Sequence, residues 1–336
     1  MSEAAMARLR RPRRWRLWLP LGSLALAGGL AVSGWLLASR PAPGFVEYSM
    51  LARTDIPTAV AVGPDGAVWF TIEFSDAIGV FRNGGIERIP KGGQNLEPLG
   101  LAADGAGGAW FTDAATRAIS HISAEGGIRS FPLRTPIVRL GRLAVAPDGA
   151  VWFADATTAS VTRLHDGALT RYDVGALGGT PYGIAVGADG TVWTTLQGAD
   201  RIGRIAADGA VTALDLPTRN GGLGDIAVDR AGAVWFLGLR ANKVGRYAGG
   251  SFAEFPVPTE SAGLGALAIA PDGSVWFTEL RAGRLGRLRD GRVTEFALPR
   301  AGSRPFGVAV DAANNVWYTD LGGWLGMLPA ARATAP

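Results

Sequence analysis

Cysteine is absent from the 336 residues, and histidine occurs only twice, at His121 and His165. Without cysteine the chain forms no disulfide, no thiolate metal site and no cysteine nucleophile. Two histidines are too few for a metal site built from several imidazole groups in one chain. Charged residues make up only 18% of the chain while hydrophobic residues make up 48%, which excludes a disordered protein and allows a large core.

Basic charge is confined to the first residues of the chain. Residues 1–16 hold six arginines and one glutamate, a net charge of +5, whereas the whole chain carries +4, so the remainder carries −1. A near-neutral body lacks the basic patch that phosphate binding requires. We therefore expect no nucleic-acid partner.

A long uncharged segment follows the arginines. Residues 17–39 contain no charged side chain, and about 20 apolar residues are enough for a helix to span a bilayer. Since basic residues flank the cytoplasmic end of such a helix, the pattern predicts a cytoplasmic segment 1–16, a transmembrane anchor 17–39 and a short spacer 40–44. The membrane would then be a partner of the chain through residues 17–39.

This arrangement places the rest of the chain outside the cytoplasm, in the periplasm or at the cell surface. A cleaved signal peptide is the alternative for the same segment, although its apolar region usually runs only about 7–15 residues. The sequence leaves open whether the segment is removed.

The body of the chain is a repeat. A Val-Trp-Phe-like core recurs seven times, with its tryptophans 41, 42, 41, 42, 41 and 41 residues apart. These tryptophans are Trp69, Trp110, Trp152, Trp193, Trp235, Trp276 and Trp317. Each copy contains an apolar run, a turn that often reads Asp-Gly, the tryptophan strand, a third run and an alternating fourth run. Four strands in about 41 residues are typical of one propeller blade.

The two ends of the repeat complement each other. The seventh copy stops after its third strand at Leu328, and an unmatched fourth-type strand, 45–50, precedes the first copy. We therefore predict an all-β fold, a seven-bladed β-propeller over 45–328 with four-stranded blades, preceded by one N-terminal transmembrane helix. The N-terminal strand would close the last blade, and 329–336 would be a C-terminal tail. An open solenoid is the alternative architecture.

The repeat unit resembles the streptogramin B lyase (virginiamycin B lyase) family. The resemblance rests on Pro-Tyr-Gly-Ile-Ala-Val at 181–186 with Ile-Gly-Arg-Ile at 202–205, and on Val-Trp-Phe-Thr-Glu at 275–279 with Leu-Gly-Arg-Leu at 285–288. It covers about residues 45–328. It implies a seven-bladed propeller that opens the ring ester of type B streptogramins by elimination with the help of Mg²⁺.

The residues that carry this chemistry in the family are not matched here. The family uses two histidines at the start of innermost strands and two glutamates near the second of them. By distance to the following tryptophan, the histidine positions are Gly265 and Phe306, and the glutamate positions are Arg304 and Leu321. None of these four can take or give a proton in the required way. The sequence therefore assigns no catalytic residue.

Acidic residues follow several tryptophan strands directly, at positions that recur on one face of a propeller. Asp113, Asp155, Glu279 and Asp320 are therefore candidate ligands for a divalent cation such as Mg²⁺ or Ca²⁺. The alternative is that these acids cap turns or pair with nearby arginines.

Ligand-contacting candidates lie at the matching strand starts. Tyr182, Phe306, Arg304 and Arg139 occupy these positions and are expected to line the channel mouth. The sequence as a whole predicts a membrane-anchored extracytoplasmic propeller that binds an unidentified small molecule or protein. The alternative is a virginiamycin B lyase-type carbon–oxygen lyase, or another metal-assisted enzyme using the acidic residues.

Overall fold

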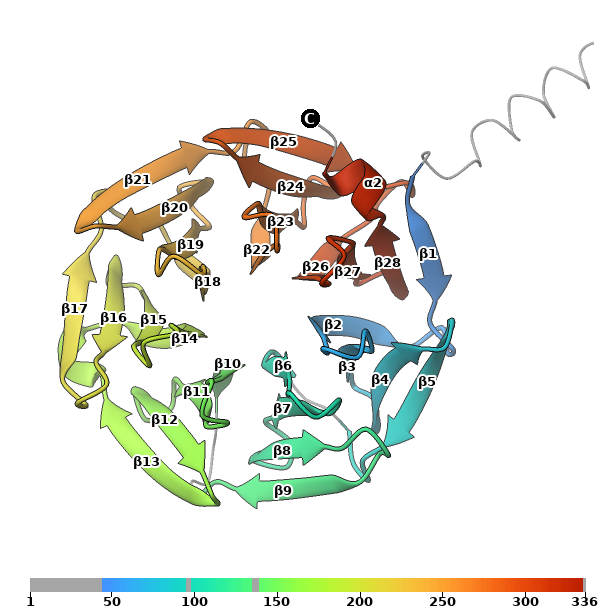
Figure 1. Ribbon diagram of the computed structural model, residues 1–336, viewed down its shortest axis with the longest axis horizontal. Coiled ribbons are helices and arrows are strands. Elements are labelled where there is room, and N and C mark those ends of the chain that lie inside the picture. The colour runs from blue at the N-terminus through green and yellow to red at the C-terminus, as the bar shows by residue number, and fades with distance from the viewer. Residues whose placement is uncertain (1–43, 95–97, 135–138, 335–336) are drawn as a thin grey trace, which may run out of the picture. The chain divides into compact units, whose positions relative to one another are not determined.

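Seven four-stranded antiparallel sheets lie side by side around a central axis (Figure 1). The computed structural model describes residues 44–94, 98–134 and 139–334. Within them each sheet corresponds to one copy of the sequence repeat, so the prediction of a seven-bladed propeller with four-stranded blades is confirmed.

The first strand of each blade lies nearest the axis and the second carries the tryptophan. The inner strands are β2 (Ile56–Val62), β6 (Leu101–Ala103), β10 (Leu140–Val145), β14 (Thr180–Val186), β18 (Leu223–Val228), β22 (Leu264–Ile269) and β26 (Pro305–Val310). The second strands are β3 (Val68–Glu73), β7 (Ala109–Asp113), β11 (Val151–Asp155), β15 (Val192–Gln197), β19 (Val234–Gly238), β23 (Val275–Glu279) and β27 (Val316–Asp320).

The third and fourth strands complete each blade toward its rim. The third strands are β4 (Ala77–Arg82), β8 (Ala118–Ile122), β12 (Ser160–His165), β16 (Arg201–Ile205), β20 (Lys243–Ala248), β24 (Arg284–Arg289) and β28 (Trp324–Leu328). The outer strands are β5 (Gly85–Pro90), β9 (Ile128–Pro132), β13 (Ala168–Asp173), β17 (Val211–Asp215), β21 (Ser251–Pro256), β25 (Arg292–Ala297) and β1 (Val46–Ser49). Two short helices, η1 (Gly175–Leu177) and α2 (Ala330–Ala333), stand outside the sheets.

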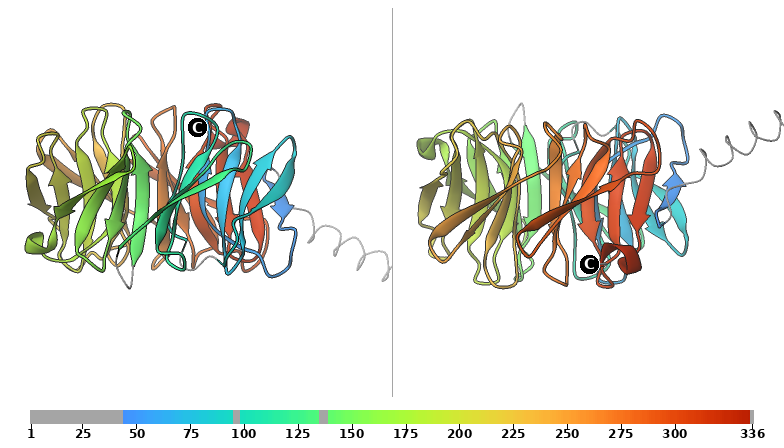
Figure 2. Two further views of the ribbon diagram at one scale, coloured as in Figure 1. Left: turned by 90° about the horizontal axis from the view of Figure 1, so that it is seen from below. Right: turned by 90° about the horizontal axis from the view of Figure 1, so that it is seen from above.

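The strands run between two faces of the ring, which the side views separate (Figure 2). On one, here called the hairpin face, tight turns join the inner and second strands. In the first of these turns Asp65 Oδ1 accepts the Ala67 N–H at 3.1 Å, and Gly66 adopts φ 84°, a conformation that favours glycine. The opposite face, here called the crossover face, carries the turns between second and third strands and the links from blade to blade.

Ring closure follows the predicted exchange of strands. The last sheet has the order β1-β28-β27-β26, so a strand from the N-terminus completes a blade made from the C-terminus. Glu47 in β1 accepts a hydrogen bond from the Tyr318 hydroxyl at 2.7 Å and pairs with Arg300 at 2.6 Å. These contacts hold the edge strand in place, and the closure prediction is confirmed.

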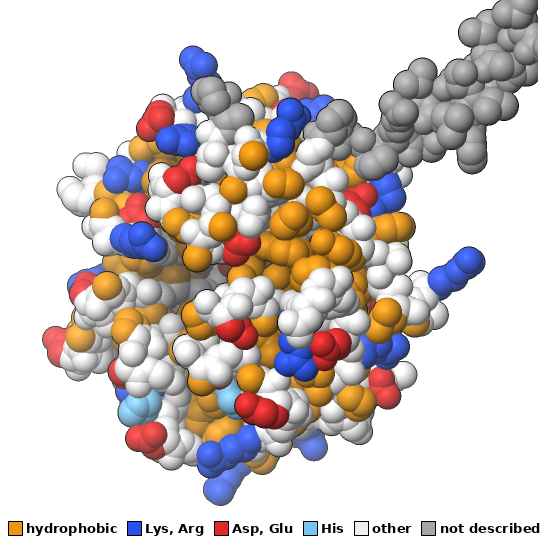
Figure 3. Space-filling model, turned by 45° about the vertical axis from the view of Figure 1, so that its right-hand side comes forward, with side chains coloured by type: hydrophobic (Ala, Val, Ile, Leu, Met, Phe, Trp, Pro, Cys, Tyr) orange, Lys and Arg blue, Asp and Glu red, His pale blue; other side chains and the backbone are white. Residues whose placement is uncertain are grey.

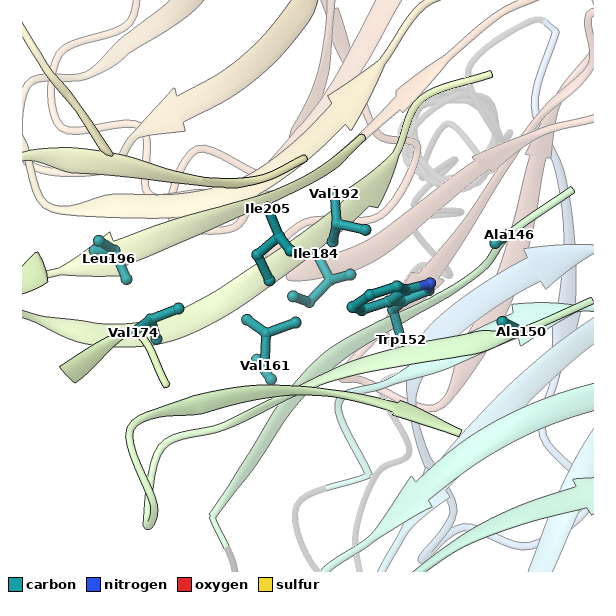
Figure 4. Packing of buried hydrophobic residues seen from close by; sticks show 10 residues of the cluster. Ala146, Ala150, Trp152, Val161, Val174, Ile184, Val192, Leu196 and Ile205 are labelled. Carbon is teal, nitrogen blue, oxygen red and sulfur yellow. The ribbon is translucent and has the colours of Figure 1, made fainter. Parts of the chain in front are cut away.

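The core consists of apolar clusters packed between neighbouring blades. Figure 4 shows one of them, in which Trp152 and Val161 of the third blade lie against Ile184, Val192 and Ile205 of the fourth. Each tryptophan strand is buried on both sides because blades pack against both of its faces. This explains why the strands read as continuous apolar runs instead of alternating ones.

The predicted anchor 17–39 lies outside the described residues. Among those that are described, no helix has both the length and the apolar character needed to cross a membrane. Part of the predicted tail 329–336 is ordered as α2, whose Ala333 carbonyl accepts a hydrogen bond from Arg287 at 2.6 Å. On the side of the ring shown in Figure 3, acidic and basic side chains are interspersed.

Candidate functional site

The inner strands begin on the crossover face with a local irregularity. In β14 the pairing with the second strand shifts register between Pro181 and Ile184, and in β26 it shifts between Pro305 and Val308. A bulge re-aims the side chains within it. Tyr182 and Phe306 stand inside these two bulges, so neither has a partner in the second strand.

A threonine on the second strand fastens most of these bulges. It stands two residues after the tryptophan, at Thr71, Thr112, Thr195, Thr278 and Thr319. The hydroxyl of Thr195, for example, accepts the Gly183 N–H at 2.9 Å and donates to the Gly224 carbonyl of the next blade at 2.7 Å. Thr71, Thr278 and Thr319 donate to the next blade in the same way. We call this contact the threonine clamp.

The clamp requires a small residue in the bulge. A Cβ added at Gly183 would lie 3.0 Å from Thr195 Oγ1, closer than ordinary contact. Every blade with this threonine accordingly has glycine or alanine ten residues before its tryptophan, at Ala59, Gly100, Gly183, Ala266 and Gly307.

Two blades lack the clamp and carry opposite charges instead. The third and fifth blades have Ala154 and Leu237 where the others have threonine, and their bulge residues are Arg142 and Asp225. The two side chains approach each other with 3.8 Å between Arg142 Nη2 and Asp225 Oδ2. Since both belong to inner strands of blades that are not neighbours, this ion pair crosses the central channel.

Each member of the pair also bonds to a neighbouring blade: Asp225 bonds forward to the sixth blade, where the clamp is missing, and Arg142 bonds back to the second blade. Arg142 Nη1 donates to the Leu99 carbonyl at 2.9 Å, and Asp225 Oδ2 accepts the Leu267 N–H at 3.2 Å. Arg142 Nε is buried and has no hydrogen-bond partner among the described residues. The guanidinium group therefore keeps unused donor capacity inside the channel.

Tyr182 and Phe306 converge on the same arginine. The Arg142 guanidinium carbon lies 5.9 Å from the centre of the Phe306 ring, within cation–π range. Burial acts to lower the pKa of Arg142, but the Asp225 carboxylate and the Tyr182 hydroxyl raise it above its usual value. The channel thus holds a permanent cation flanked by two aromatic rings and one carboxylate.

The two other ligand candidates occupy the rim. Arg139 and Arg304 are exposed and precede β10 and β26 on the crossover face. Their backbone groups are used locally, because Arg139 N–H donates to Thr157 Oγ1 at 2.8 Å and Arg304 N–H donates to Asp320 Oδ2 at 3.1 Å. The structure therefore brings Tyr182 and Phe306 together at Arg142.

Three of the four predicted metal ligands turn back into their own loops. Asp113 pairs with the buried Lys91 at 2.6 Å, and Asp155 Oδ1 accepts the Thr157 N–H at 2.9 Å. Asp320 Oδ1 accepts the Gly322 N–H at 2.7 Å, while its other oxygen accepts the Arg304 N–H. These contacts match the turn-capping and pairing alternative.

Glu279, the fourth candidate, is fully buried. Its carboxylate oxygens have no hydrogen-bond donor among the described residues. Its neighbour Glu295 is satisfied by Thr259 N–H at 2.8 Å and by Arg284 at 2.6 Å. Burial, with Glu295 close by, raises the pKa of Glu279 to about 8, so its side chain is protonated at neutral pH and is a weak metal ligand.

The Mg²⁺ that the resemblance implies does not fit this donor set. Among the residues that the structure describes, no three histidine, aspartate or glutamate side chains come together to hold a metal ion. The four acids belong to different blades, and Arg304 stands where a carboxylate is expected. Their assignment as metal ligands stays a prediction.

The position of the first family histidine offers no free space. A Cβ added at Gly265 would lie 2.7 Å from Thr278 Oγ1 and 3.2 Å from the Phe306 carbonyl oxygen. The threonine clamp between the sixth and seventh blades fills this volume, since Thr278 donates to that same carbonyl at 3.0 Å. A side chain at residue 265 therefore requires the clamp to shift.

The channel pair was absent from the sequence prediction. Neither Arg142 nor Asp225 is among the candidate site residues that the sequence predicts. One signal could have identified both: they are the only charged residues at the position ten before the tryptophan, where the other five copies have glycine or alanine.

Comparison with known proteins identifies relatives for this architecture. The model of the virginiamycin B lyase family matches residues 42–163 and 138–328. A virginiamycin B lyase from Nocardia farcinica (strain IFM 10152) is 36% identical over 149 residues, which are 44% of this chain and 51% of that protein. The chain thus matches about half the length of that curated relative.

Solved structures extend the likeness to the whole ring. A catalytically inactive histidine-to-alanine variant of virginiamycin B lyase from Staphylococcus aureus, with quinupristin, superposes with a TM-score of 0.79 at 26% identity and covers 84% of this chain and 98% of that one. A streptogramin B lyase structure gives the same score and identity, with 84% and 96% covered. YCF48 from Cyanidioschyzon merolae, at 12% identity and a TM-score of 0.67 over 86% and 99%, shares the fold alone.

Proposed function

Because the chain belongs to the virginiamycin B lyase family, we propose that it keeps the family's propeller as a binding module and has lost the ring-opening reaction. The module is anchored in the membrane through residues 17–39 and faces the periplasm or the cell surface. Its ligand is an unidentified small molecule or protein that contacts the crossover face.

One observation carries the loss of the reaction. The two positions that correspond to the family's histidines hold Gly265 and Phe306, neither of which titrates. Both histidines of this chain lie on third strands, His121 in β8 and His165 in β12. In the Staphylococcus aureus relative, a variant with one histidine replaced by alanine is catalytically inactive. A chain without a positioned acid or base loses about 10²–10⁴ in rate for each such group.

The charged and aromatic side chains at the mouth support one class of ligand. Arg142 lies in the channel with an unused Nε donor, between Tyr182 and Phe306, and the exposed Arg139 and Arg304 lie on the same face. Basic groups beside aromatic rings favour an amphipathic ligand with an acidic group, because the guanidinium groups contact the anion and the rings contact the apolar part.

A product assay tests the proposal. The full chain in detergent is incubated with a type B streptogramin, with and without Mg²⁺, and the linear product is measured by mass spectrometry. We expect no product above the buffer rate. Linear product that disappears in Asp320→Ala or Glu279→Ala would instead establish the lyase alternative, with the acidic residues as a relocated active site.

Membrane attachment is tested separately. Protease added to intact spheroplasts should remove the propeller, and the full-length chain should stay with the membranes in a carbonate wash. A propeller protected from external protease, or a soluble mature form beginning near residue 40, would contradict the anchor.

A further inference from the structure

A cavity lies on the hairpin face, between the third and fourth blades. Its volume is about 480 Å³. Trp152, Tyr172, Arg163, Asp148 and Asp189 are among the residues that line it. The rings of Trp152 and Tyr172 are 5.2 Å apart between their centres. The cavity therefore joins an aromatic pair to two carboxylates, well away from the channel mouth of the crossover face.

Other blades show what the tryptophan at this repeat position contacts. In three of them an arginine from the third strand lies over the indole ring: Arg204 over Trp193 at 5.8 Å, Arg246 over Trp235 at 5.4 Å and Arg287 over Trp276 at 6.0 Å. Arg287 also lies over Phe296, on the outer strand of the same blade, at 5.7 Å. The repeat thus places a guanidinium group over the tryptophan in three blades, and in the sixth blade the same group also lies over an outer-strand ring.

The third blade leaves this site without its internal cation. Arg163 pairs with Trp152 across the strands just as Arg204 pairs with Trp193. Its guanidinium group donates to Asp148 at 2.7 Å instead of covering the indole. The arginine is therefore drawn to the turn, and the edge of the largely buried Trp152 lines the cavity together with the partly exposed Tyr172.

The indole N–H of Trp152 also has no hydrogen-bond acceptor within the described part of the chain. In the fifth and seventh blades the tryptophan N–H donates to an aspartate six residues earlier, Asp229 or Asp311. The matching residue in the third blade is Ala146, which lines the cavity. Figure 4 shows the Trp152 nitrogen on the side of the ring toward Ala146.

The facing wall, from the fourth blade, contributes a second carboxylate, Asp189, which has no direct ion pair among the described residues although the charge of Arg204 acts on it. Asp189 corresponds to Asp272 in the sixth blade, where Arg289 neutralises it at 3.2 Å. At the position of Arg289 the fourth blade has Ala206, which opens space and leaves Asp189 without that partner. Hydrogen bonds from Thr191, and the positive charge of Arg204, hold the pKa of Asp189 below its usual range, so this carboxylate is ionised at neutral pH.

We propose that this cavity binds an organic monocation of the guanidinium or alkylammonium class. The cation lies against the rings of Trp152 and Tyr172, where the other blades place their own arginine, and between the carboxylates of Asp148 and Asp189. Aromatic rings with adjacent acids are the usual environment for such ligands.

Titration of the full chain in detergent with methylguanidinium and with tetramethylammonium, followed by calorimetry, tests the site. We expect saturable binding with a dissociation constant in the millimolar range. Arg163→Ala removes the positive charge that pairs with Asp148 at the cavity wall and should tighten binding about threefold or more. Asp148→Asn keeps the turn cap but removes a charge and releases Arg163 toward the indole, so it should weaken binding about threefold or more.

Asp65→Asn, at the matching turn of the first blade, is the control and should leave the affinity unchanged. Thermal melting of each variant checks that the fold is kept. The proposal is wrong if neither probe saturates at tens of millimolar, if Arg163→Ala and Asp148→Asn shift the affinity in the same direction, or if Asp65→Asn weakens binding as much as Asp148→Asn. Such a result leaves the function proposed for the crossover face untouched.

Discussion

Replacing Glu279 by glutamine should stabilise the propeller at neutral and alkaline pH. Glu279 is fully buried, and its neighbour Glu295 already accepts hydrogen bonds from Thr259 and Arg284. Glutamine has nearly the same size and shape as glutamate but carries no charge to bury. It therefore removes the cost of ionisation without leaving a cavity.

The size of the effect follows from the pKa of Glu279, which is raised from 4.5 to about 8 in the folded chain. Between these two values the native state binds one more proton than the unfolded state, so the free energy of unfolding falls as pH rises. The slope is about 1.4 kcal/mol per pH unit. The wild type should thus lose about 3 kcal/mol by pH 7 and up to about 5 kcal/mol above pH 8, relative to pH 4.5.

Urea denaturation of wild type and Glu279→Gln at pH 5, 6.5 and 8 measures this difference. The two proteins should have similar stability at pH 5, and the variant should be more stable by a margin that grows toward pH 8. Glu260→Gln, an exposed acid near Thr259, is the control and should follow the wild type. Parallel curves for wild type and Glu279→Gln over this pH range would refute the assignment of a raised pKa.

Three further predictions concern the ring itself. Thr319→Val removes the clamp from the last blade to the first and should lower the free energy of unfolding by about 1–2 kcal/mol, whereas Thr319→Ser should keep most of it; calorimetry distinguishes them. Arg142→Met leaves Asp225 buried without its partner and should cost about 3 kcal/mol, and adding Asp225→Ala should restore part of that loss; an additive double variant would contradict the channel pair. Deleting 45–50 should cost several kcal/mol and promote aggregation through the exposed edge, so an unchanged melting temperature would mean that β1 does not close the ring.

The architecture could be derived from the sequence because it depends on a regular signal. Seven tryptophans at nearly constant spacing set the number of blades, and the unmatched strand before the first copy indicated how the ring closes. The structure confirms both, with β1 beside β28.

The candidate site was less accessible because it depends on exceptions within the repeat. The direction of Asp113 or Asp320 does not follow from strand alternation, since the second strands are buried on both faces. The Gly322 amide binds the Asp320 carboxylate, and Lys91 binds the Asp113 carboxylate. These contacts depend on the three-dimensional positions of the partners, so they do not follow from the sequence pattern. The pairing of Arg142 with Asp225 joins positions 83 residues apart, so no local pattern connects them.

The strand exchange at the seam has a consequence for the order of events during synthesis. The hydrogen bond between Glu47 and Tyr318 joins residues 271 positions apart, and β1 leaves the ribosome before any other strand of the ring. Its partner β28 emerges last, so the earlier blades can assemble before β1 has a strand to pair with. Every molecule therefore passes through a stage with two open sheet edges, and the time to translate the chain sets how long these edges stay available to other proteins.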